Sequence, residues 1–129
     1  MSYTELFGWL SCVFFILVCC YSIYKRFICK RYNLSISIKK SLNYHCIFTV
    51  VATILALLHT GKNLINLDFS IAFISLLFMV IITLLGIVLK YFSNVSVIQR
   101  KILLYAHIIL TTFLVEALLI HIISNYFTE

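Results

Sequence analysis

The sequence predicts an all-α protein, an integral membrane four-helix bundle that forms a single domain over residues 1–129. Of its residues, 64% are hydrophobic and only 11% are charged, whereas a soluble domain carries about 25% charged residues. Four apolar runs each reach about 20 residues, the length that crosses the hydrocarbon core of a bilayer. Proline is absent and glycine occurs three times, so long helices are not interrupted.

The four apolar runs are the expected membrane spans. Helices are the expected spanning element, because a β-barrel would show shorter, alternating segments and could not close with so few strands. Glu116 is the only formally charged residue inside a run, and its spacing from His107 and His121 places it on the other side of that helix. The runs cover residues 6–24, 42–60, 69–89 and 102–123.

Basic residues indicate how the spans are oriented. Six of them lie between the first and second runs and three lie within residues 90–101, whereas the connection between the second and third runs holds only Lys62. By the positive-inside rule the first and third connections are cytoplasmic, so both termini lie outside the cytoplasm. No basic residue precedes the first run, which favours a retained span over a cleaved signal peptide. Contact with membrane lipid accounts for these charges, and nucleic-acid binding is not expected.

The four histidines are the candidate functional residues. His45 and His59 lie 14 residues apart in the second run, and His107 and His121 lie 14 apart in the fourth. Fourteen residues come within about 40° of whole helical turns, so both histidines of a run share one side of the helix, about 21 Å apart along it. The two runs are separated by one helix and therefore point in the same direction. His45 then lies at the depth of His107, and His59 at the depth of His121, where two facing imidazoles could supply the axial ligands of a haem iron.

Other roles for the histidines are open at this point. A histidine inside a span can serve packing or hydrogen bonding, and a proton relay needs no repeated spacing. A zinc ion would require two further ligands at each depth. Matched spacing and matched depth favour two b-type haems with His45, His59, His107 and His121 as the iron ligands. The haems would be bound non-covalently, because the sequence has no C-x-x-C-H motif.

Small residues and threonines near the histidines are further candidates for haem binding. Small side chains leave room for a macrocycle between helices. A threonine one turn after a histidine can orient a ligand imidazole, or it can bond back to a carbonyl of its own helix. These candidate cofactor-binding residues are Ala52, Ala56, Ala117, Thr49 and Thr111.

Two parallel spans that each carry H-x13-H and are separated by one helix resemble the di-haem four-helix core of the cytochrome b family, and of ferric-reductase-like membrane cytochromes. The resemblance covers nearly the whole chain and rests on the four histidines. It implies low-spin b-type haems, stacked across the membrane, that pass electrons between its two faces. Glycines that commonly flank haem in cytochrome b are missing from the second and fourth runs, and Gly8 and Gly86 are the glycines inside the other two.

The expected function is that of a membrane b-type cytochrome subunit that carries electrons across the membrane through two bis-histidine haems. No G-x-G-x-x-G or P-loop motif occurs, so we expect no catalytic domain in this chain. Its redox partners in a complex would be flavin or iron–sulfur proteins, or a quinone. Two alternatives are a quinone-reactive cytochrome b subunit of an oxidoreductase and a haem-free membrane assembly or transport subunit.

Overall fold

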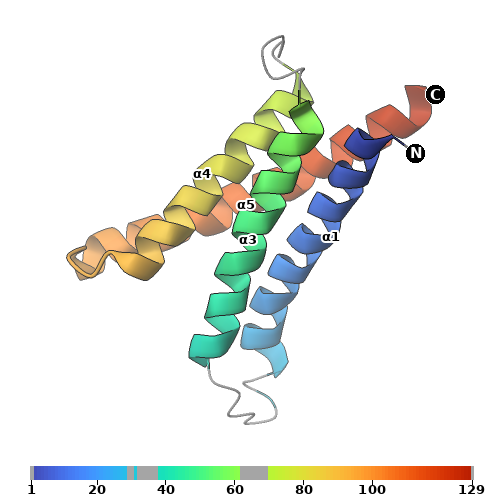
Figure 1. The fold of residues 1–129 in the computed structure, drawn as a ribbon. Helices are drawn as coiled ribbons and strands as arrows, with labels where there is room; N and C mark the ends of the chain where they lie inside the picture. The colour runs from blue at the N-terminus through green and yellow to red at the C-terminus, as the bar shows by residue number, and fades with distance from the viewer. Residues whose placement is uncertain (1, 29–30, 32–37, 62–69, 129) are drawn as a thin grey trace. The chain divides into compact units, whose positions relative to one another are not determined.

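The computed structural model describes residues 2–28, 31, 38–61 and 70–128, and this part of the chain is almost entirely helical (Figure 1). Its four α-helices are each long and apolar enough to cross a membrane, which confirms the predicted all-α fold class. A five-residue π-helical turn, η1 (Tyr24–Ile28), continues the first helix. The α-helices are α1 (Tyr3–Ile23), α3 (Ile38–Thr60), α4 (Ile71–Tyr91) and α5 (Val97–Thr128).

Serine side chains cap the starts of three helices. At α1, the Ser2 hydroxyl accepts a hydrogen bond from the Glu5 amide, and the Glu5 carboxylate accepts one from the Ser2 amide. Ser96 and Gln99 form the same reciprocal arrangement before α5. The Ser70 hydroxyl accepts from the amide three residues later, at the start of α4. The caps before α1 and α5 explain why these two helices begin earlier than their apolar runs.

The described chain divides into two compact units, Met1–Gly61 and Lys62–Glu129. In the first unit, α1 and α3 lie side by side and antiparallel (Figure 1). The ring centroids of Phe14 and Phe48 are 5.7 Å apart in the middle of this contact. Gly61 directly follows α3 with a φ of +45°, a left-handed conformation that glycine adopts without a steric penalty.

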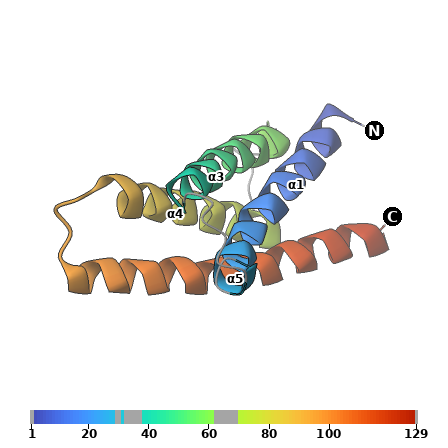
Figure 2. The same cartoon turned by 90° about the horizontal axis from the view of Figure 1, so that it is seen from below.

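In the second unit, α4 and α5 form an antiparallel helical hairpin with a short turn between them (Figure 2). The rings of Phe78 and Phe113 pack at a centroid distance of 6.4 Å. Near the turn, the Arg100 guanidinium donates a hydrogen bond of 2.9 Å to the Leu89 carbonyl, one of the last carbonyls of α4. This bond fixes the start of α5 against the end of α4.

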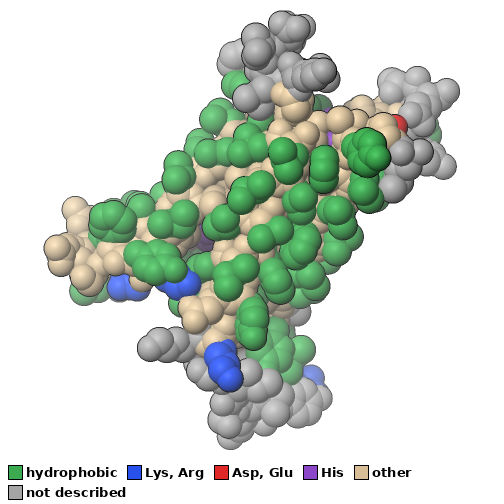
Figure 3. All heavy atoms as spheres, viewed as in Figure 1, with side chains coloured by type: hydrophobic (Ala, Val, Ile, Leu, Met, Phe, Trp, Pro, Cys, Tyr) green, Lys and Arg blue, Asp and Glu red, His purple; other side chains and the backbone are tan. Residues whose placement is uncertain are grey.

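Apolar side chains cover the flanks of the helices. Figure 3 shows hydrophobic side chains along the visible helices, with lysine and arginine side chains toward helix ends. Many large side chains, such as Trp9, Leu84 and Phe113, are more than half exposed. Surfaces of this kind suit a hydrocarbon environment. The predicted topology rests on the uneven distribution of basic residues among the connections. Two of these residues, Lys30 and Lys62, lie outside the described residues, so the orientation of the termini stays a prediction.

Candidate functional site

The four histidines lie inside uninterrupted helices and are each half-buried. His45 and His59 belong to α3, and within the first unit this helix packs against α1. Both of these imidazoles contact α1, so they share one side of α3, as the 14-residue spacing predicts. The other two histidines belong to α5, in the second unit.

The imidazole of His59 is held by the first turns of α1. Its Nδ1 lies 2.6 Å from the carbonyl oxygen of Thr4. A carbonyl oxygen only accepts hydrogen bonds, so Nδ1 is the donor in this contact, and in a neutral ring Nε2 then keeps its lone pair. Gly8 leaves the space for this ring, because a Cβ at position 8 would lie 2.8 Å from Nδ1 of His59. The sequence did not indicate either contact.

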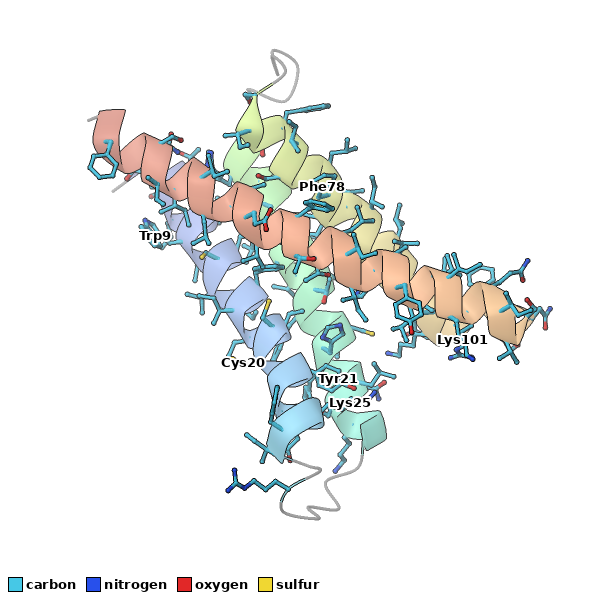
Figure 4. All side chains as sticks on the ribbon, turned by 180° about the vertical axis from the view of Figure 1, so that it is seen from behind. Trp9, Cys20, Tyr21, Lys25, Phe78 and Lys101 are labelled. Atoms are coloured by element: carbon cyan, nitrogen blue, oxygen red, sulfur yellow. The ribbon has the colours of Figure 1, made fainter. Side chains whose placement is uncertain are left out.

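The imidazole of His45 packs against the ring of Tyr21. The ring centroids are 4.8 Å apart and the planes are tilted by 40°. Figure 4 shows Tyr21 projecting from α1 toward α3. An aromatic contact of this geometry restricts the rotation of the imidazole. One side of α1 therefore contacts both histidines of α3, through Tyr21 at one end and Thr4 and Gly8 at the other.

The imidazole of His107 faces α4 in the second unit. Its ring lies beside the backbone of Ile82 on α4. A Cβ at Gly86 would lie 3.5 Å from Cε1 of His107, which is an ordinary van der Waals contact. Gly8 and Gly86 thus each lie against a histidine of the paired helix, but only Gly8 is in a position that excludes a larger residue.

The imidazole of His121 lies near the C-terminal end of α5. The Asn125 side-chain amide, one turn later, donates a hydrogen bond of 3.3 Å to Nε2 of His121. Coordination of a metal by that nitrogen would replace this bond. Glu116, in the middle of α5, has an exposed side chain.

The two candidate threonines bond to the backbone of their own helices. The Thr49 hydroxyl donates to the carbonyl of His45, and the Thr111 hydroxyl donates to the carbonyl of His107, both at 2.7 Å. This geometry corresponds to the back-bonding role that the sequence left open beside imidazole orientation. In both cases the acceptor is the backbone carbonyl of the histidine one turn earlier, so α3 and α5 have the same local hydrogen bond after their first histidine.

The three candidate alanines differ in their surroundings. Ala52 is almost completely buried and its carbonyl accepts a hydrogen bond of 2.9 Å from the Ser11 hydroxyl of α1. Ala56 is half-buried, and its carbonyl accepts the Thr60 hydroxyl of the same helix. Ala117 on α5 is buried. Ala52 therefore takes part in the contact of α3 with α1.

Within residues 2–28, 31, 38–61 and 70–128, no three His, Cys, Asp or Glu side chains come close enough to hold a metal ion.

Comparison with protein-family models, with curated proteins and with solved structures finds no match to this chain. The likeness to the cytochrome b family accordingly rests on the histidine pattern alone.

Proposed function

We propose that this protein is a membrane b-type cytochrome subunit that binds two haems through His45, His59, His107 and His121. The observation that carries the proposal is the repeated spacing of two histidines, 14 residues apart, on two separate membrane-length helices. Ionisable side chains inside a span are costly and tend to mark functional sites. Four such residues with one repeated spacing favour a shared role.

The surroundings of the histidines fit haem ligation. In His59 the Nδ1 proton is bound to a backbone carbonyl and Nε2 keeps a lone pair, which is the arrangement typical of metal-ligating histidines. His45 is restrained by the ring of Tyr21. Neutral imidazoles are also the ligands expected in an apolar span, because no charge has to be removed from water.

The proposed pairing follows from the order of the helices in the chain. If each helix crosses the membrane once, α3 and α5 begin at the same face. His45 is then at the depth of His107 and His59 at the depth of His121, so that each pair supplies two axial ligands at one depth. Bound haem would supply one-electron redox chemistry, while the chain supplies ligands, orientation and an environment that excludes water.

The partners of such a subunit would be other redox components of the membrane. Flavin proteins, iron–sulfur proteins or a quinone are the proposed donors and acceptors, because the sequence carries no nucleotide-binding motif. The chain would then work as part of a complex, and it would carry electrons between two partners bound at opposite faces.

A haem determination on the purified full-length protein tests the proposal. A pyridine haemochrome assay on protein saturated with haemin should give two b-type haems per chain. The double variant His45→Ala/His59→Ala, which removes both ligands of α3, should bind none stably. The control Thr112→Val changes an exposed residue that bonds within α5, and it should keep both haems. A wild-type protein without haem would contradict the proposal and favour an assembly or transport role.

A further inference from the structure

We propose that α1 positions His59 as a metal ligand: the Thr4 carbonyl selects the Nδ1–H tautomer, Gly8 provides the space for the ring, and Nε2 is the ligating atom. This inference rests on the proposed function, because the ligated metal is taken to be a haem iron. It adds to the proposed function a positioning role for α1, a helix that contributes no ligand of its own.

The tautomer follows from the short contact between His59 and Thr4. At 2.6 Å, Nδ1 and the carbonyl oxygen are within hydrogen-bond distance, and only the nitrogen can supply the proton. A neutral imidazole carries one N–H, so Nε2 is the atom with a lone pair. Backbone carbonyls often hold metal-ligating histidines in this way, and the bond fixes both the tautomer and the orientation of the ring.

Gly8 is required because the two helices approach closely at this point. A Cβ at position 8 would lie 2.8 Å from Nδ1 and 2.9 Å from Cε1 of His59, which is closer than such atoms pack. Both backbones are held in helices, so the imidazole is the group that has to move. Its displacement would break the bond to Thr4. The Thr4 carbonyl belongs to the backbone, so no substitution of the Thr4 side chain removes its bond to His59. Replacing Gly8 by alanine is therefore the specific way to remove that bond.

The bond to Thr4 should also influence the redox behaviour of the bound iron. Donation from Nδ1–H to a carbonyl makes the imidazole more basic and Nε2 a stronger electron donor. A stronger donor stabilises the oxidised metal and lowers its reduction potential. Loss of the bond should therefore shift the potential of the haem that His59 ligates upward and leave the other haem unchanged.

Nitrogen NMR of the full-length protein without haem tests the tautomer directly. With 15N-labelled histidine, assigned by single His→Gln variants, His59 should show a protonated Nδ1 and an unprotonated Nε2. Gly8→Ala should abolish this signature. Gly86→Ala is the matched control, because its Cβ would meet His107 at an ordinary 3.5 Å, and it should leave His59 unchanged. A protonated Nε2 in wild-type His59 would overturn the inference.

A redox titration of the haemin-loaded protein provides the second measurement. Gly8→Ala should raise the potential of one component, the same one that His59→Ala removes, whereas Gly86→Ala should move neither. Unchanged potentials in a folded, fully loaded Gly8→Ala protein would overturn the inference while the proposed function stands. If the protein bound no haemin but His59 showed the Nδ1–H signature that Gly8→Ala abolishes, the proposed function would fail and the positioning of His59 would be supported.

Discussion

The Ser11 hydroxyl donates a hydrogen bond of 2.9 Å to the carbonyl of Ala52, and both residues are buried in the contact between α1 and α3. Polar bonds between helices in an apolar environment contribute about 0.6 kcal/mol on average. This bond also joins α1 to the segment of α3 midway between its two histidines, so it supports the register in which α1 contacts both imidazoles.

Replacing Ser11 by alanine should lower the stability of the folded protein by about 0.6 kcal/mol, because one bond between the helices is lost while the small side chain still packs. Equilibrium unfolding in mixed micelles measures the change. Thr112→Val is the control, since the Thr112 hydroxyl is exposed and bonds within its own helix. Equal losses in the two variants would show that the Ser11 bond has no specific contribution.

The sequence predicted the helices well because their signal is strong. Long apolar runs without proline define four spans, and the structure has a membrane-length helix at each. The ends were less predictable. The helix α5 extends from Val97 to Thr128, beyond the apolar run at 102–123. It starts early because of the Ser96–Gln99 cap and because Gln99, Arg100 and Lys101 form helix readily, a property that is not visible in hydropathy alone.

The contacts of α1 with the histidines could not be predicted in the same way. A helix that is apolar on all sides has no periodic pattern to show which side faces its neighbour. The sequence therefore indicated that His45 and His59 share a side of α3, but it did not indicate that this side faces α1. Gly8 was the available signal, because a glycine inside a span often marks a close approach of two helices.

Tyr21 should restrain His45 through its ring, since the two rings are 4.8 Å apart. Tyr21→Leu should broaden or shift the electron paramagnetic resonance signal of the haem that His45 ligates and leave the signal of the His59 haem unchanged. Tyr21→Phe keeps the ring and should behave like wild type. If Phe and Leu had the same effect, the hydroxyl rather than the ring would be the group that acts on His45.

The orientation of the chain can be tested with reporter fusions. The positive-inside rule places the turn between α4 and α5 in the cytoplasm and the C-terminus outside. Alkaline phosphatase, which is active only outside the cytoplasm, should be active when fused after Glu129 and inactive when inserted after Asn94. The opposite pattern would reverse the assignment of the two faces, and with it which histidine pair faces the cell interior.

The pairing of the histidines can be tested by redox titration of the four single alanine variants. If α3 and α5 cross the membrane in the same direction, His45 shares a haem with His107 and His59 shares the other with His121. His45→Ala and His107→Ala should then remove one redox component, and His59→Ala and His121→Ala the other. The second haem is about 21 Å away along the helix and should be kept.

The double variants make this test stricter. One missing ligand already breaks a bis-histidine site, so His45→Ala/His107→Ala should titrate like either single variant and still show one component. In contrast, His45→Ala/His121→Ala removes one ligand from each proposed site and should show none. If this second combination kept a component, His45 and His121 would share a haem. The two helices would then cross in opposite directions, which is incompatible with one membrane crossing for each of the helices α3, α4 and α5.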